Sequence, residues 1–164
     1  MLRRLNSRGL TLIEVLASAA ILAFVVLLFS LLFTQGYRNS KTEENRDQSV
    51  TIARSVMEII KTNLPSPTAS ASFNGTPINL TAIRNANAAT ATVASFNTQY
   101  PGSTDGTYTI VVTADPVAES VTVESNVFPL NQYFRKVKVH VTETTFQSQY
   151  TLESYLEYNK VNKE

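Results

Sequence analysis

The chain has 164 residues, with 14 basic and 13 acidic side chains and a formal net charge of +1 at neutral pH. This balance gives no overall bias toward nucleic acid, and the absence of cysteine excludes a disulfide-stabilised scaffold. The length fits one exported domain of about 130 residues behind a membrane span, and a domain of that size buries its own core.

An apolar segment follows a basic N-terminus. Three arginines lie before residue 9, and the run from Val15 to Phe33 has only two serines as polar interruptions. At a rise of about 1.5 Å per residue, this run nearly crosses a hydrocarbon core of about 30 Å, so it predicts a membrane-spanning helix. The arginines before the run place Met1 in the cytoplasm by the positive-inside rule.

Glu14 lies at the start of this segment, where a charge is unfavourable. Inserting a charged side chain costs about 2.5 to 3.5 kcal/mol, so the carboxylate needs a partner. A cleaved secretory signal and a simple uncleaved anchor share the basic start and the apolar run. The first needs a small-residue cleavage pattern after the run, which is poor here, and the second leaves Glu14 unexplained.

The sequence Arg8-Gly9-Leu10-Thr11-Leu12-Ile13-Glu14-Val15-Leu16 resembles the N-terminus of a type IV prepilin. The resemblance implies that a membrane peptidase cuts after Gly9 and methylates the new N-terminal residue, Leu10, while the apolar helix is retained. The family more often has phenylalanine after the cut, so Leu10 departs from its pattern.

Cleavage after Gly9 would supply a partner for Glu14, because it creates an α-amino cation at Leu10, one helical turn away. Removing either member of a buried ion pair costs about 3 to 5 kcal/mol. The contact forms within one subunit or, as the resemblance implies, between neighbours whose helices bundle into a filament. The alternative is a Glu14 side chain that snorkels to the inner headgroups.

Helix contacts in such a bundle would use small residues that permit close approach. These residues are Ala17, Ser18, Ala20, Ala23 and Ser30. No proline precedes Pro65, so Gly36 is the only candidate hinge in this part of the chain.

The domain boundaries follow from these segments. We expect a leader peptide at residues 1–9, a transmembrane and assembly helix at 10–36, and a soluble pilin head at 37–164. Within the head we expect a helix at 37–64, a variable loop region at 65–104, and an antiparallel sheet at 105–164.

The helix of the head has an apolar stripe at three- and four-residue steps, which predicts packing on the protein's own sheet in preference to a ligand site. The stripe consists of Ala53, Val56, Met57, Ile60 and Leu64. Pro65 and Pro67 are expected to end this helix.

Residues 68–104 are rich in alanine, serine, threonine and asparagine and predict little regular structure. Apolar residues that would anchor a short strand or turn are Phe73, Ile78, Leu80 and Ile83. Residues 86–94 are expected to form a loop or a weak helix. Asn74 and Asn79 each begin a glycosylation-acceptor pattern, which a bacterial chain rarely uses.

Alternating residues predict strands in the last third of the chain. Residues 108–113 are rich in branched side chains, and Val121 and Val123 alternate with polar neighbours. Residues 134–142 place valines on one face, and residues 150–158 continue the alternation after a hairpin loop at 143–149. The predicted fold class is α+β, with a long N-terminal helix whose second half packs on an antiparallel β-sheet, as in pilins.

The sequence predicts no catalytic, cofactor or metal site. His140 is the only histidine and lies on an outer strand face, without a carboxylate or nucleophile at a recognisable spacing. Asp105 and Asp115 lack the clustered spacing of calcium motifs. A basic stripe, either a solvated face or a DNA contact, consists of Arg135, Lys136, Lys138 and His140.

The resemblance implies a minor pilin or pseudopilin, a structural subunit of a pilus, type II secretion or competence filament, and not an enzyme. Its expected partners are other major and minor pilins, the prepilin peptidase, the membrane assembly platform, and lipid before assembly. It would lie in the inner membrane as a single-pass protein and then in a cell-surface or periplasmic filament. The alternatives are a head that binds DNA or a surface, and an exported domain unrelated to filaments.

Overall fold

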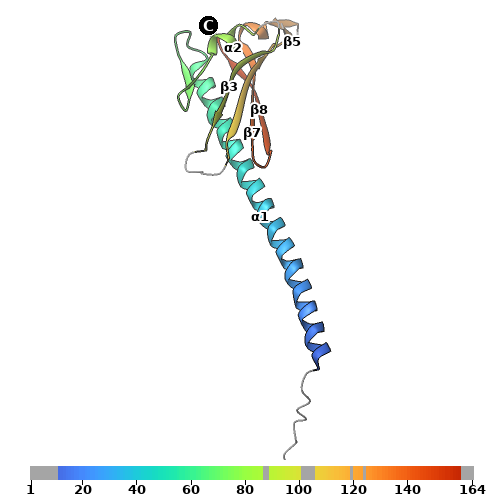
Figure 1. The fold of residues 1–164 in the computed structure, drawn as a ribbon. Coiled ribbons are helices and arrows are strands. Elements are labelled where there is room, and N and C mark those ends of the chain that lie inside the picture. The colour runs from blue at the N-terminus through green and yellow to red at the C-terminus, as the bar shows by residue number, and fades with distance from the viewer. Residues whose placement is uncertain (1–10, 87–88, 101–105, 119, 124, 160–164) are drawn as a thin grey trace, which may run out of the picture. The chain divides into compact units, whose positions relative to one another are not determined.

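The computed structural model describes residues 11–86, 89–100, 106–118, 120–123 and 125–159 (Figure 1). The expected leader at 1–9 and the expected methylation site Leu10 lie outside these residues. The chain divides into two compact units, Met1–Lys41 and Thr42–Glu164. The first unit holds the apolar part of helix α1, and the second holds the rest of that helix and the described strands.

Helix α1 runs from Leu12 to Asn63 and is uninterrupted at Gly36. A glycine inside a helix costs roughly 0.5 to 1 kcal/mol relative to alanine, which the neighbouring helical residues tolerate here. The helix ends directly before Leu64 and Pro65, as the sequence predicted, because proline has no amide hydrogen to continue the ladder.

Four antiparallel strands form the main sheet, in the order β3-β4-β7-β8. They are β3 (Ala91–Thr98), β4 (Tyr108–Asp115), β7 (Phe134–Glu143) and β8 (Gln149–Glu157). Burial alternates along β4 and β7, and the β7 valines predicted to face inward are fully buried. The predicted strands and the final hairpin are therefore confirmed.

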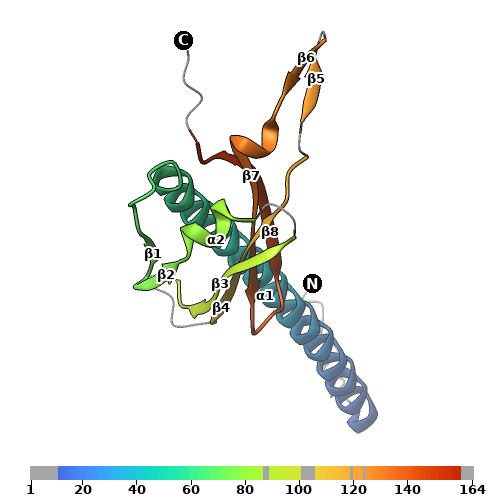
Figure 2. The same ribbon diagram turned by 90° about the horizontal axis from the view of Figure 1, so that it is seen from above.

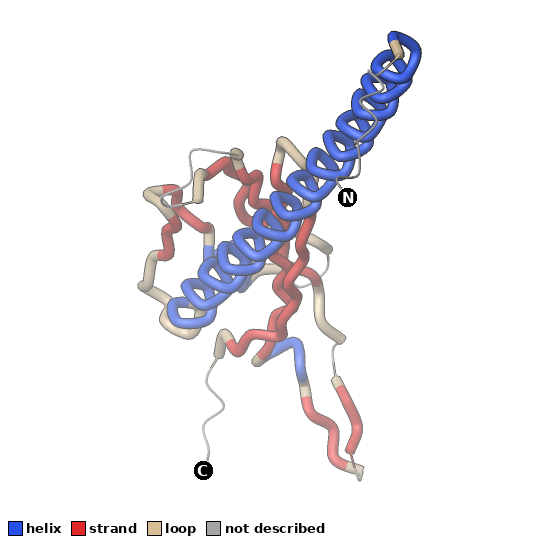
Figure 3. The backbone as a smooth tube through the Cα atoms, turned by 90° about the horizontal axis from the view of Figure 1, so that it is seen from below, coloured by secondary structure: helices blue, strands red, loops and turns tan. Residues whose placement is uncertain are grey.

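The second half of α1 lies on one face of this sheet (Figure 3). All five residues of the predicted apolar stripe are buried in the common core, together with Ile52. On the sheet side the core includes Ile110, Val112 and Val139, each with no exposed surface. This is the α+β arrangement that the sequence predicted, with the helix packed on its own sheet.

Residues 65–104 contain more regular structure than we expected. Strands β1 (Ala71–Phe73) and β2 (Thr76–Ile78) form a hairpin, and helix α2 (Leu80–Arg84) follows. The expectation of a loop or weak helix at 86–94 is wrong for its last part, because β3 begins at Ala91 and forms an edge of the main sheet. A register shift between Thr92 and Ala94 interrupts the alternation that would have revealed this strand.

The sheet expected over 105–164 is also not a single sheet. Strands β5 (Val121–Val123) and β6 (Asn126–Phe128) form a separate two-stranded hairpin, followed by a 3₁₀ helix, η1 (Leu130–Gln132). Figure 2 shows this hairpin projecting from the main sheet at the end where β7 begins. Alternation at Val121 and Val123 predicted β5 but not β6, and it carries no information on which sheet a strand joins.

Two arginines connect the end of α1 to the sheet. The Arg84 guanidinium donates to the carbonyl of Leu64, at 3.1 Å from Nε and 2.9 Å from Nη2, and to that of Ser66 at 2.5 Å. These carbonyls follow the last helical turn, where helical partners run out. The carbonyl of Arg84 accepts from Nε and Nη2 of Arg135, at 3.0 and 2.8 Å. The chain of bonds thus joins α1, α2 and β7.

A buried carboxylate organises the turn between β7 and β8. Glu143 has no exposed surface, and its side-chain oxygens accept from the amides of Thr145 at 2.7 Å and Phe146 at 2.5 Å. Gly106 passes close by with φ +94°, and a Cβ built on it would lie 2.8 Å from Glu143 Oε1. Only glycine fits this position without displacing the carboxylate.

Tyr108 connects this end of the sheet to α1. It is fully buried, and its hydroxyl donates to Gln48 Oε1 at 2.6 Å. Burial disfavours the phenolate and, with the nearby negative charge of Glu143, raises the pKa of Tyr108 from 10.0 to about 12.

We predict that Gly106→Ala destabilises the head by about 2 to 4 kcal/mol, since it combines left-handed strain with loss of hydrogen bonds to a charged group. Gly75→Ala is the matched control, because Gly75 also has positive φ, +79°, but has open space around it. Urea unfolding of the full chain in detergent, followed by circular dichroism, measures both. Equal losses in the two variants would contradict the packing argument.

We predict that the stabilising effect of Tyr108 falls as pH rises from about 10 to about 12. In this window the unfolded chain releases the phenol proton while the folded chain keeps it, so alkali favours unfolding. Relative to Tyr108→Phe, which does not titrate, the wild type should lose up to about 2 to 3 kcal/mol of unfolding free energy. A pH-independent difference between the two proteins would refute the raised pKa.

Candidate functional site

The apolar part of α1 exposes its large side chains on all sides. Leu12, Leu22 and Phe33, for example, are 80%, 65% and 75% exposed. The helix is long and apolar enough to cross a membrane. Soluble proteins rarely leave so much contiguous apolar surface uncovered, so this segment requires lipid or other apolar helices around it.

Polar side chains within this segment bond to the helix itself. The hydroxyls of Ser18, Ser30 and Thr34 donate to the carbonyls of Glu14, Val26 and Ser30, at 2.7, 2.9 and 2.9 Å. In hydrocarbon a hydroxyl without a partner is unfavourable, and this backbone bonding removes that cost. Ser18 and Ser30, two of the small residues expected at helix contacts, therefore have their hydroxyl hydrogen bonds satisfied within the helix.

Thr11 caps the N-terminus of α1. Its carbonyl accepts the first helical bond, from the amide of Val15 at 3.2 Å, and its hydroxyl accepts from the amide of Glu14 at 3.3 Å. Glu14 occupies the third helical position, as in the Thr-x-x-Glu capping box. We did not predict this cap, although the pattern Thr11-Leu12-Ile13-Glu14 indicates it.

The position of Glu14 in the first turn of the helix does not by itself offset the free-energy cost of placing its charge in hydrocarbon. A carboxylate near a helix N-terminus gains typically 0.3 to about 1 kcal/mol from the helix dipole. Placing the charge in hydrocarbon costs about 2.5 to 3.5 kcal/mol, so about 2 kcal/mol remains for another cation to offset. Gly9 and Leu10, the other two predicted site residues, lie outside the described residues.

The family model for the prokaryotic N-terminal methylation motif matches residues 4–30, which include Gly9, Leu10 and Glu14. This motif is characteristic of type IV prepilin-like proteins. No curated protein and no solved structure matched the chain in the corresponding searches. The match therefore covers the N-terminal segment, and the head is understood from its own structure.

A prepilin-like N-terminus implies processing by a prepilin peptidase and assembly with other pilins. Together with the apolar helix, it indicates a membrane-anchored, single-pass protein. The motif also points to a structural role for the chain.

Three of the four residues of the predicted basic stripe lie together on the outer face of β7, namely Lys136, Lys138 and His140, whereas Arg135 does not. Arg135 faces the core with 2% of its surface exposed, and its guanidinium lies 4.0 Å from the centre of the Tyr158 ring. Alternate residues of a strand face the same side, and Arg135 alternates with Val137 and Val139, so its position in β7 predicts that it faces the core. The proposed stripe thus loses its arginine.

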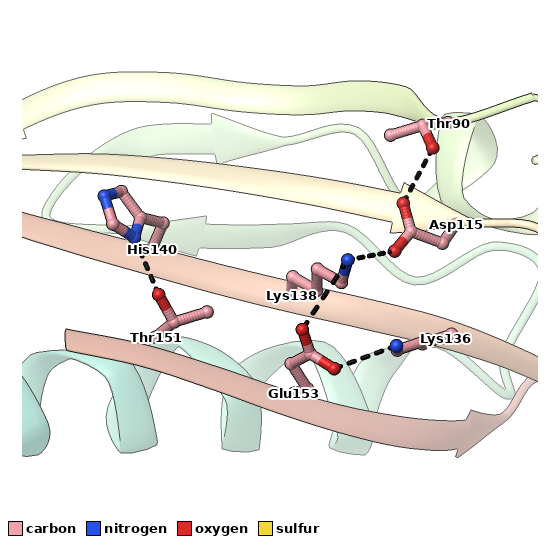
Figure 4. Close-up of polar contacts among 7 residues, drawn as sticks. All are labelled: Thr90, Asp115, Lys136, Lys138, His140, Thr151 and Glu153. Carbon is pink, nitrogen blue, oxygen red and sulfur yellow. Dashed lines mark hydrogen bonds and ion pairs between the residues drawn. The ribbon is translucent and has the colours of Figure 1, made fainter.

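The two lysines of the stripe are ion-paired on the outer face of the sheet (Figure 4). Lys136 Nζ lies 2.8 Å from Glu153 Oε2, and Lys138 Nζ lies 2.7 Å from Asp115 Oδ2 and 3.5 Å from Glu153 Oε1. The hydrogen bond from Lys138 lowers the pKa of Asp115, and that from Lys136 lowers the pKa of Glu153. This face is charge-balanced, which disfavours phosphate binding.

His140 lies on the same outer face, as predicted. Its Nδ1 is 2.7 Å from Thr151 Oγ1 and its Nε2 is 3.1 Å from Thr142 Oγ1. Both ring nitrogens are thus engaged by hydroxyls of the sheet. These contacts orient the ring but provide neither a carboxylate partner nor a nucleophile for acid–base chemistry.

Within the described residues, no three histidine or acidic side chains gather in a way that could hold a metal ion. The Asp115 carboxylate accepts a hydrogen bond from the Thr90 hydroxyl at 2.8 Å and pairs with Lys138, so both of its contacts are within the head. Asp105, the other residue considered for calcium, lies outside the described residues.

The two asparagines that begin glycosylation patterns have structural contacts. Asn74 lies with Gly75 in the tight turn of the β1–β2 hairpin, and its amide donates to Thr98 Oγ1 at 2.7 Å. Asn79 is the N-cap of α2, and its side-chain oxygen accepts from the amide of Ala82 at 3.0 Å. Both patterns are accounted for by local folding.

Proposed function

We propose that this chain is a minor pilin or pseudopilin, a structural subunit that enters a type IV pilus-like filament through its N-terminal helix. The observation that supports this best is the methylation motif at residues 4–30 followed by an exposed apolar helix with Glu14 in its first turn. In this proposal residues 1–9 are the leader, 10–36 the transmembrane and assembly helix, and 37–164 the head.

The proposed maturation supplies the cation that Glu14 needs. A prepilin peptidase cuts after Gly9 and methylates Leu10, and the methylated amine keeps its positive charge. Before assembly, Glu14 reaches the amine of its own chain or the inner headgroups. In the filament, Glu14 meets the amine of a neighbouring subunit, which offsets the remaining cost of the buried charge and fixes the axial register between subunits.

The proposed location and partners follow from this cycle. The unassembled protein crosses the inner membrane once, with its N-terminus in the cytoplasm, and rests on lipid and the assembly platform. The assembled protein lies in a cell-surface or periplasmic filament beside other major and minor pilins. The filament belongs to a twitching pilus, a type II secretion system or a competence apparatus.

We predict that Glu14→Ala and Glu14→Gln both impair filament assembly while leaving membrane insertion intact. Glu14→Gln keeps the shape and removes only the charge, so a loss there identifies the ion pair as the cause. Sedimentation of sheared filaments measures assembly, and alkaline extraction of membranes measures insertion. Gly9→Val should separately block the mobility shift that accompanies cleavage. Normal assembly in all three variants would rule out the proposal.

A head that binds DNA is the principal alternative, and its test is separate. The basic stripe that favoured it is replaced by a charge-balanced face, so we predict that the full chain in detergent does not retard DNA even at low salt. A gel-shift titration over a range of salt concentrations measures this. Retardation that weakens steeply with salt would revive the DNA-binding function.

A further inference from the structure

The β5–β6 hairpin is an arm that stands apart from the main sheet and carries exposed apolar side chains. Its strands pair with each other and with no other strand of the described residues. Val121 and Phe128 are directly opposite each other in the register, so they share one face, and they are 41% and 49% exposed. An isolated two-stranded hairpin is marginally stable in water, which makes an external contact favourable for this arm.

A groove of about 570 Å³ lies elsewhere on the same head, between α1 and β8. Its apolar lining includes Met57, Leu152 and Leu156, and Ser154 between the two leucines leaves space on the strand. Two basic and two acidic side chains and two serines also line it, so the groove carries no net charge. An apolar insert would therefore contact Met57, Leu152 and Leu156, while the charged side chains stay at the margin of the contact.

The strand beside this groove is also open to addition. Among the described residues β8 pairs with β7 alone, over nine residues without a register shift. A regular, unpaired edge of this length is a template for another strand, whose alternate side chains would enter the groove.

Antiparallel pairing of β8 with β8 of a second molecule is electrostatically unfavourable. In an antiparallel pair centred on the strand, Glu153 of one copy would face Glu153 of the other, and like charges directly opposite are unfavourable. A two-fold contact of this kind also closes on itself, whereas a filament needs a head-to-tail contact between different surfaces. The arm and the groove are two such surfaces on one chain.

We propose that the β5–β6 arm of one subunit docks along β8 of a second copy and inserts Val121 and Phe128 into the groove between β8 and α1. The inference rests on the proposed filament function, because it joins the heads of two copies that lie next to each other in the filament. The occupant of the groove is thus the same chain, and neither a small molecule nor a peptide of another protein.

Disulfide cross-linking between two differently tagged full-length copies tests this contact. The chain has no cysteine, so any disulfide comes from the introduced pair. Val121→Cys in one copy should cross-link to Ser154→Cys in the other within the assembled fraction. Tyr155→Cys is the matched control, because it lies on the same strand, faces the opposite side and is 62% exposed.

A second variant tests the apolar insert. Adding Phe128→Ser to the Val121→Cys copy should lower the cross-linking yield about tenfold, since burial of an aromatic side chain contributes at least that factor to association. Equal yields for the Ser154→Cys and Tyr155→Cys partners, or a yield unchanged by Phe128→Ser, would overturn the inference. Recovery of wild-type protein in sedimented filaments tests the proposed function independently, so filaments without the cross-link refute only the docking.

Discussion

A single carboxylate in an apolar helix constrains the rest of this protein. Glu14 lies in the first turn of α1, capped by Thr11, and the apolar run that follows exposes its side chains all around the helix. Capping and the helix dipole offset only part of the cost of that charge in hydrocarbon. We propose that the ammonium group created by cleavage within the motif at residues 4–30 offsets the remainder.

The head is stabilised without disulfides, through an apolar core and a few buried polar connections. Arg84 and Arg135 join the end of α1 to the sheet, while Glu143 and Tyr108 organise the opposite end of the strands. Arg84 is half-buried and the other three are buried, and each of these polar groups has backbone or side-chain partners, which is the condition for burying them. The folded head thereby exposes the outer face of its sheet and the β5–β6 arm to other molecules.

Periodicity determined which elements could be predicted from the sequence. The stripe on α1 and the alternation in β4, β7 and β8 are regular, and these elements appear where expected. In β3, small side chains and a register shift hide the alternation. Arg135 was misplaced because its charge suggested solvent, although its parity with Val137 indicated the core. Charge type was thus a weaker guide to burial than strand register.

The candidate functional residues likewise fall into those that a local sequence pattern reveals and those that only the fold brings together. The sequence singled out Gly9, Leu10 and Glu14 because a short motif before a membrane helix is local, and their roles stay predictions. The groove could not be predicted from the sequence, because its lining residues come from α1 and β8, far apart in the chain, and meet only in the folded head. The strands of the arm are local, but their separation from the main sheet appears only in the folded head.

In the proposed maturation, cleavage after Gly9 creates the ammonium group that pairs with Glu14. Mass spectrometry of the N-terminal peptide from purified filaments measures the product of this cleavage. We expect a chain that starts at Leu10 and carries one methyl group on its amine. Filaments whose subunits still start at Met1 would refute this ammonium group as the partner of Glu14.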